Sequence, residues 1–302
     1  MSRLLASLDA PPSGRFRPVW FDAVAYGRAR LLGGGDLPWQ APAELTSFFG
    51  KTQAMFGSDA VLADVADVFA QRAAADQALR AAMVARSRPG YALRTLLGDE
   101  RARADAADAV GALAATKGAV PLVLTVPAPG RWLAAAAAVA NPGAAPPEAG
   151  QAETAAMYSA DFLRTFGDAG VDGLLLDEGP VPAEGPVPAG QLTDPEAYRP
   201  VLNVAEHYGW PVLIRTEAAA AWPHGPVPGV ALWIGSSGPA AAPAAAGSGS
   251  PAGGGAPGRW GVLAGPDFWA DADPPADADL VLAQIPAQAD PEAVMKRVRA
   301  LT

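Results

Sequence analysis

The chain has 302 residues, of which 22 are Lys or Arg and 31 are Asp or Glu, so its formal net charge is −9. This acidic balance argues against a protein that coats nucleic acid, and it favours a small-molecule substrate or a protein partner. The absence of cysteine excludes disulfides, thiolate zinc sites and a cysteine nucleophile. Only two imidazole groups are available for chemistry, those of His207 and His224.

The start of the sequence lacks the features of a secretory signal. Residues 1–18 mix charged side chains with prolines and contain no apolar run followed by a cleavage site. The most apolar run, residues 133–140, is about half as long as a membrane-spanning helix. We therefore expect a cytoplasmic protein with no membrane partner.

Short apolar runs closed by turn residues predict eight strands. These runs are continuous stretches instead of alternating ones, as in VPLVLTV and WPVLIRT, which is typical of parallel strands that are covered on both faces. The expected strands are residues 19–23, 60–63, 120–126, 173–176, 211–215, 230–234, 260–263 and 280–284.

Helical spacing of apolar residues recurs between these runs. The clearest helix is expected at residues 153–169, and Gly170 then stops it before the next strand. Similar patterns occur at residues 43–56, 99–116 and 195–208. Eight strands alternating with helices, in a chain near the ~250 residues typical of the fold, predict one α/β domain over residues 1–302, a (β/α)8 TIM barrel. An open doubly wound sheet is the alternative, but no Gly-x-Gly-x-x-Gly follows the first strand.

Two segments interrupt this pattern. Residues 236–258 are rich in Gly and Pro and poor in large apolar side chains, so we expect a flexible insertion there or, as an alternative, a lid over the barrel. The barrel is accordingly expected to be irregular around strands six to eight. Residues 177–190 contain EGPVPA twice and predict a stiff, extended loop after the fourth strand.

Active sites of such barrels lie at the carboxyl ends of the strands, so the polar residues that follow each apolar run are the candidates. Carboxyl groups there can act as acids or bases, and cations or an imidazole can hold an anionic substrate. The candidate catalytic residues are Asp22, Asp64, Asp177 and Glu217, and the candidate substrate-binding residues are Arg28, Arg215 and His224.

Each candidate has a structural alternative. Asp177 and Glu178 are adjacent and point in different directions, so only one should face a pocket, and Glu178 is expected to be a helix cap or a solvated charge. Arg215 and Glu217 share a strand face and either form a structural ion pair or leave Arg215 to hold a substrate carboxylate. His207 lies within a helical pattern and is expected at the surface. No catalytic triad spacing or compact metal motif is visible, and the sequence names no cofactor.

Six segments of the chain, taken together, carry a resemblance to a known family. They are RPVWFDAVAYGR (17–28), FGSDAVLADVADV (56–68), VPLVLTVPAPGRWLAAA (120–136), FGDAGVDGLLLDEG (166–179), GWPVLIRTE (209–217) and ADPEAVMKRVRAL (289–301). Their order and spacing resemble those of segments in uroporphyrinogen decarboxylase, and the chain is similar to the superfamily that includes this enzyme and cobalamin-independent methionine synthase. The resemblance implies a TIM barrel, a homodimer and lyase or methyltransferase chemistry.

The family's functional positions are only partly present. Ala23 falls at the first arginine of the family's signature, and Arg28 matches the second with a shift of one residue. Ala66 falls at the acid that binds the pyrrole NH groups, although Asp64 shares its strand face and can substitute. Ala283 replaces the family's histidine. The zinc-thiolate mechanism of the methyltransferases is excluded without cysteine.

We therefore expect a diverged member that acts on a small, anionic organic substrate as a lyase or transferase, and not a true uroporphyrinogen decarboxylase. The alternative is a non-catalytic barrel retained as a binding or assembly protein. That alternative predicts a closed or shallow mouth and an exposed apolar patch. The patch would involve Trp233, Trp260, Phe268 and Trp269.

Overall fold

A computed structural model describes residues 2–88, 90–143, 149–179, 195–217, 228–236 and 259–301. Three sequence predictions lie outside the described residues. They are the insertion beyond Ser236, the repeated EGPVPA segment beyond Gly179, and the candidate ligand His224.

Eight parallel strands form one sheet that curls into a nearly closed barrel, with the order β1-β8-β7-β6-β5-β4-β3-β2. Because the first strand pairs with the last, the fold is a (β/α)8 TIM barrel and the alternative of an open doubly wound sheet is wrong. Each expected strand is present, with ends within two residues of those expected. The strands are β1 (Val19–Asp22), β2 (Val61–Asp64), β3 (Leu122–Pro127), β4 (Gly173–Asp177), β5 (Val212–Arg215), β6 (Val230–Gly235), β7 (Trp260–Ala264) and β8 (Leu280–Gln284).

The barrel interior is filled by alternate residues of the strands. Successive side chains of a strand point to opposite faces, so register partners around the sheet face the same way. Trp20, Val123, Leu175, Leu213 and Leu282 pack together inside, each with less than 3 % of its surface exposed. The intervening apolar residues face outward, against the helices.

Helix α1 (Arg3–Asp9) closes the amino-terminal end of the barrel. Ser2 caps this helix through a hydrogen bond from the Leu5 N–H, and Leu4 and Leu8 pack into the interior cluster. Gly173 opens β4 at this end, where a Cβ would lie 2.2 Å from the Leu4 Cδ2. Helix α1 therefore acts as a plug at this end of the barrel, and a side chain at position 173 would clash with it.

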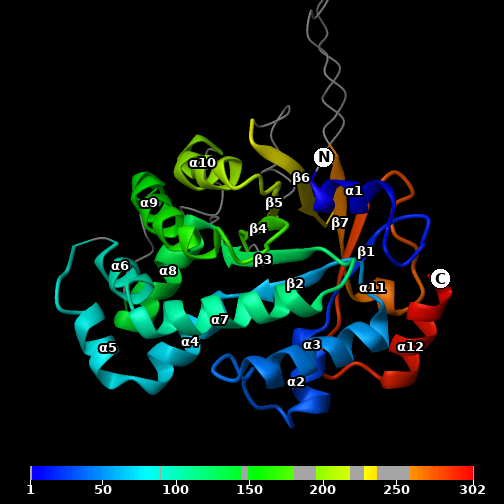
Figure 1. Cartoon of the computed structure of the whole chain (residues 1–302), viewed down its shortest axis with the longest axis horizontal. Helices are drawn as coiled ribbons and strands as arrows, with labels where there is room; N and C mark the ends of the chain where they lie inside the picture. The colour runs from blue at the N-terminus through cyan, green and yellow to red at the C-terminus, as the bar shows by residue number, and fades with distance from the viewer. Residues whose placement is uncertain are drawn as a thin grey trace, which may run out of the picture.

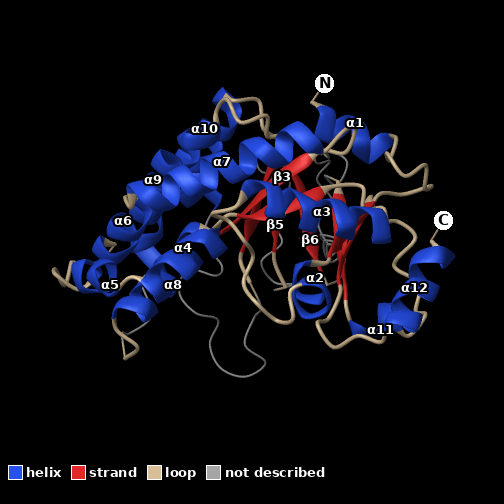
Figure 2. Cartoon of the chain, turned by 60° about the horizontal axis from the view of Figure 1, so that its bottom comes forward, coloured by secondary structure: helices blue, strands red, loops and turns tan. Residues whose placement is uncertain are grey.

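The helical layer is uneven around the barrel. Helices α4 to α10 gather on the side of β2 to β5, whereas α11 and α12 lie beside β7 and β8 (Figures 1 and 2). The four helices expected from the sequence are α3, α7, α9 and α10. The remaining helices of the layer were not assigned from the sequence. The helices are α2 (Val24–Leu31), α3 (Pro42–Phe56), α4 (Ala66–Ala75), α5 (Gln77–Met83), α6 (Tyr91–Leu97), α7 (Glu100–Thr116), α8 (Pro129–Ala140), α9 (Ala152–Leu163), α10 (Arg199–His207), α11 (Pro266–Trp269) and α12 (Pro291–Ala300).

Local sequence explains several helix ends. Asp99 caps α7 by accepting the Ala102 N–H, and Asp290 caps α12 by accepting the Ala293 N–H. After α9, one 3₁₀ turn (Arg164–Phe166) leads to Gly170, whose φ of +73° ends the helical segment as expected.

The irregularity expected around strands six to eight falls in the helical layer. The described residues between β5 and β7 contain no helix, and α11 has only four residues. The β6–β7 and β7–β8 pairs are parallel and in register. Among the described helices, none combines the length and the hydropathy that crossing a bilayer requires.

Candidate active site at the carboxyl ends of the strands

Polar residues end five of the strands and face the barrel interior. Asp22 is in register with Gln284, and Asp177 is in register with Arg215. Asp64, at the end of β2, is in register with Thr125 of β3. These residues continue the inward-facing rows that begin with the apolar interior residues, so the mouth of the barrel is lined by charge and hydrogen-bonding groups.

Arg215 is the centre of a polar network across one side of the mouth. Its Nη2 donates to Glu217 Oε1 and to Gln284 Oε1, each at 3.3 Å, and its Nε lies 3.6 Å from Asp177 Oδ1. Gln284 Nε2 donates in turn to Asp22 Oδ2 at 3.1 Å. The structure therefore contains the Arg215–Glu217 ion pair that the sequence allowed, while no described residue accepts a hydrogen bond from Arg215 Nη1.

Asp177 is held by two arginines and a turn. Arg131, in the first turn of α8, pairs with Asp177 Oδ2, and the Gly179 N–H donates to Asp177 Oδ1 at 2.9 Å. Gly179 has φ +75°, and a Cβ on it would lie 2.7 Å from Arg131 Nε. Arg131 was missed in the sequence, although its position just after the third strand is a site position in this fold.

Asp64 has a different environment from the other inward carboxylates. Its Oδ1 accepts the Ala66 N–H at 3.1 Å, and no cation contacts it in the part of the chain that the structure describes. Asp64 is exposed to water at the end of β2, although many protein atoms lie around its carboxyl. Desolvation by these atoms, followed by the charges of Asp67, Asp22 and Asp177, raises the pKa of Asp64 to about 7, against the lowering effect of the Ala66 N–H.

Thr125 lies next to Asp64 and was also missed. Its Oγ1 is buried and has no hydrogen-bond partner among the described residues. Because register partners on adjacent strands face the same way, this hydroxyl and the Asp64 carboxyl line the same part of the mouth. The signal in the sequence was a single polar residue at an inward position of an otherwise apolar strand.

Glu178 corrects one sequence expectation. It was expected to be a helix cap or a solvated charge, but the side chain points away from the barrel interior and the residue is only 4 % exposed. Burial, followed by the charge of Asp177, raises the pKa of Glu178 to about 8, although Arg131 opposes this shift. As expected for adjacent strand residues, Asp177 faces the mouth and Glu178 does not.

Not every candidate reaches the mouth. Arg28 lies on α2, where its Nε donates to the Gly35 carbonyl at 2.9 Å and its Nη2 pairs with the exposed Asp36, so it does not join the group around Arg215. His207 is exposed on α10, with its ring against Tyr208. No group of three or more His, Asp or Glu side chains could hold a metal ion within the described ranges.

The aromatic residues do not form the surface patch predicted by the non-catalytic alternative. Trp260 is 7 % exposed and Phe268 is 4 % exposed. Trp269 Nε1 donates to the Gln284 carbonyl at 2.9 Å, and its ring packs against Phe268. The prediction of an exposed apolar patch at these residues is therefore wrong.

No family model matches the chain, and searches of curated proteins and of solved structures find no significant match. The fold and the site define a TIM barrel with an acidic polar group at the carboxyl ends of its strands. Many unrelated reactions use this fold, so a function must be argued from the side chains in the mouth.

Proposed function

We propose that the protein is a diverged barrel enzyme of the uroporphyrinogen decarboxylase type, a lyase or transferase that acts on a small, anionic organic substrate. Asp64 is the acid–base group, and Arg215 binds the anionic group of the substrate. The observation that carries the proposal is the Asp64 carboxyl, which lies at the mouth with no cation partner among the described residues and has a pKa near neutrality.

The chemistry that fits this site is decarboxylation followed by protonation of carbon. When the bond to the carboxyl group breaks, carbon dioxide leaves and the bonding electron pair stays on the substrate carbon. Protonated Asp64 donates its proton to that carbon, and water then returns a proton to the carboxylate. A group with a pKa near 7 exists in both forms at neutral pH, which suits donation and recovery in one cycle.

The other carboxylates have supporting roles in this proposal. Asp22 and Asp177 are held by Gln284 and by two arginines, and their charges favour the protonated form of Asp64. Glu217 orients Arg215, whose Nη1 remains directed at no described acceptor. The substrate carboxylate would take this position, because guanidinium groups bind carboxylates through paired N–H donors.

The resemblance in the sequence supports the same class of reaction. It also favours a homodimer, while the acidic net charge favours a small-molecule substrate over a nucleic acid. We propose a cytoplasmic location with no membrane partner. The second candidate is a non-catalytic barrel, and one observation favours it: Arg215 already pairs with both Glu217 and Asp177. In that case the mouth is a structural ion-pair network.

A ligand screen by thermal shift separates the two candidates, because a ligand that binds only the folded state raises the melting temperature. We would screen small carboxylic acids, tetrapyrroles, corrinoids, folates and divalent metals against the wild type, Arg215→Met and Arg103→Met. Arg103 is the matched control, since it pairs with Asp161 on the surface. We expect a carboxylic acid that stabilises the wild type and Arg103→Met but not Arg215→Met.

The hit then becomes the substrate for a turnover assay with Asp64→Asn. We expect this variant to bind the ligand but to lose turnover at least about 100-fold, the lower range of general acid–base contributions. Turnover that persists in Asp64→Asn would rule out the proposed acid–base role. A screen in which none of these compounds binds in an Arg215-dependent way would favour the non-catalytic barrel.

A further inference from the structure

The barrel closes differently between β1 and β2 than elsewhere. Seven strand pairs around the sheet form parallel ladders, and no ladder joins β1 to β2. The edge of β1 that faces β2 must therefore satisfy its backbone groups in another way. The two strands on either side of this seam carry Asp22 and Asp64 at their carboxyl ends.

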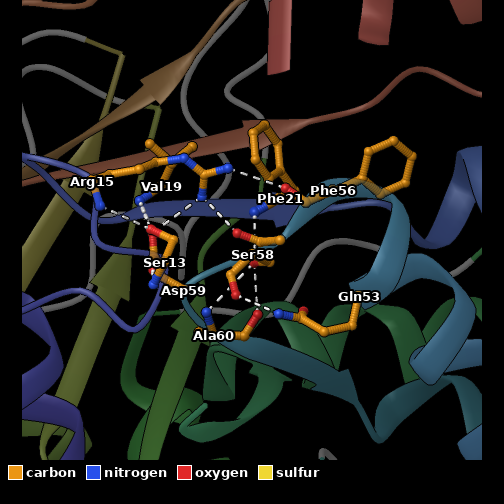
Figure 3. Close-up of polar contacts among 10 residues, drawn as sticks. Ser13, Arg15, Val19, Phe21, Gln53, Phe56, Ser58, Asp59 and Ala60 are labelled. Carbon is orange, nitrogen blue, oxygen red and sulfur yellow. Dashed lines mark hydrogen bonds and ion pairs between the residues drawn. The ribbon is translucent and has the colours of Figure 1, made fainter. Parts of the chain in front are cut away.

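Side chains from the turn before β2 replace the missing ladder (Figure 3). The Val19 N–H donates to Asp59 Oδ2 at 2.9 Å, and the Asp59 N–H donates to the Val19 carbonyl at 3.0 Å. The Phe21 N–H donates to Ser58 Oγ at 3.0 Å, and this hydroxyl donates to the Ala60 carbonyl at 2.7 Å. Ser58 and Asp59 thus clasp β1 to the start of β2.

Further contacts to the segment before β1 hold the clasp in place. Asp59 is fully buried, and it accepts the Ser13 N–H at 2.8 Å and pairs with Arg15 at 3.4 Å. The Arg15 guanidinium also donates to the carbonyls of Phe56 and Gly57 at the end of α3. Figure 3 shows the guanidinium, the Asp59 carboxylate and the Ser58 hydroxyl in one group between β1 and the segment leading into β2.

The carboxyl ends of the two strands have no such tie. Among the described residues, no hydrogen bond joins β1 and β2 beyond Phe21. A small cavity lies beside the seam, between β1, the first half of β2 and α3, with Phe21, Ser58 and Leu62 on its wall. We therefore attribute the separation of the two strand ends to the clasp, which joins β1 to the turn before β2.

We propose that Ser58 and Asp59 are positioning residues for the acid–base group: by closing the β1–β2 seam they set the distance between Asp22 and Asp64. This inference rests on the proposed function only in giving Asp64 its acid–base role. The groups that act on Asp64 are Asp22 from across the seam, Asp67 from α4 and Asp177 from β4. Of these three carboxylates, Asp22 is the one whose distance from Asp64 depends on how the β1–β2 seam is closed.

The test is the titration of Asp64 in the whole protein, followed by NMR of the ¹³Cγ of labelled aspartate and assigned with Asp64→Asn. Ser58→Ala removes the acceptor of the Phe21 N–H, so the strand ends should separate and Asp22 should move away from Asp64. A larger distance between the two carboxylates favours the ionised form of Asp64, and we expect its midpoint to fall by about half a unit or more. Asp22→Asn should lower the midpoint in the same direction.

Ser159→Ala is the matched control, because Ser159 is buried on α9 with no partner for its Oγ among the described residues. We expect it to leave the Asp64 midpoint unchanged, even if it changes the melting temperature. A wild-type midpoint near 7 that is the same in Ser58→Ala would overturn the positioning role and leave the proposed function standing. A wild-type midpoint at the ordinary value of an aspartate would instead remove the basis of the proposed function.

Discussion

Replacing Asp59 by alanine is the sharpest test of how the barrel closes. Asp59 is fully buried and accepts hydrogen bonds from the Ser13 N–H, the Val19 N–H and Arg15. The substitution leaves the Arg15 side chain, which is 4 % exposed, charged and without its counter-ion. It also removes the acceptor of two backbone N–H groups at the seam.

The cost follows from these losses. Removing one partner of a buried ion pair costs about 3–5 kcal/mol, and each buried donor left unsatisfied costs about 1–3 kcal/mol. Arg15 keeps the carbonyl acceptors of Phe56 and Gly57, and the terms are not additive, so we expect a loss of about 4 kcal/mol. Such a loss is a large share of the ~5–15 kcal/mol that stabilises a typical domain.

Equilibrium unfolding in urea, followed by circular dichroism, measures this loss. Asp161→Ala is the control, since it breaks the exposed pair with Arg103 and should cost less than about 1 kcal/mol. The double variant Arg15→Met/Asp59→Ala should be less destabilised than the two single variants added together, because it leaves no buried charge alone. A loss below about 1 kcal/mol in Asp59→Ala would show that the clasp does not hold the seam.

Three further predictions concern the plug, the turn at β4 and the pH dependence of folding. Leu4→Ala should destabilise by about 2–5 kcal/mol in urea, and combining it with Gly173→Ala should cost less than the sum, because the added Cβ occupies the space that Leu4 leaves. Additive losses would refute this contact. Gly179→Ala should destabilise the fold by about 1–2 kcal/mol, because residue 179 has a left-handed backbone conformation. Gly111→Ala, inside α7 with open space at its Cβ, should instead stabilise the fold by about 0.5–1 kcal/mol. Equal effects of the two substitutions would contradict the left-handed conformation of Gly179. Because the pKa of Glu178 is raised to about 8 in the folded chain, its contribution to stability is present below about pH 4.5 and is lost as the pH rises toward 8, by up to about 1.4 kcal/mol per unit. In Glu178→Gln, the free energy of unfolding measured in urea should fall less steeply with pH across that range. A slope equal to that of the wild type would refute the burial of an ionising group at this position.

The strands were predictable because their burial on both faces leaves short, continuous apolar runs that are closed by turn residues. The end of each run then located Asp22, Asp64, Asp177 and Arg215, since parallel strands of a barrel all end on one face. Their alternation also indicated that Asp177 and Glu178 point to opposite sides. The burial of Glu178 was not predictable, because it depends on what packs outside β4.

The remaining differences between the expected and the observed site arise from contacts between distant segments. Arg28 follows β1 closely in sequence, but α2 begins at Val24 and carries it outward to Asp36. Arg131 acts in the mouth only because α8 starts beside Asp177, which is 46 residues away in the chain. Helices α4 to α6 have only seven to ten residues each and bury two or three side chains apiece, so their apolar spacing was weak. The clasp at Ser58 and Asp59 was hidden for the same reason, since its partners come from β1.

The most direct test of the account is the titration of Asp64 in the wild-type protein by ¹³Cγ NMR. We predict a midpoint near 7, because nearby protein atoms and three other carboxylates disfavour the ionised form, and no cation contacts the carboxyl in the part of the chain that the structure describes. A midpoint near the ordinary value of 3.8 would mean that Asp64 is ionised throughout the neutral range and is not the proton donor of this barrel.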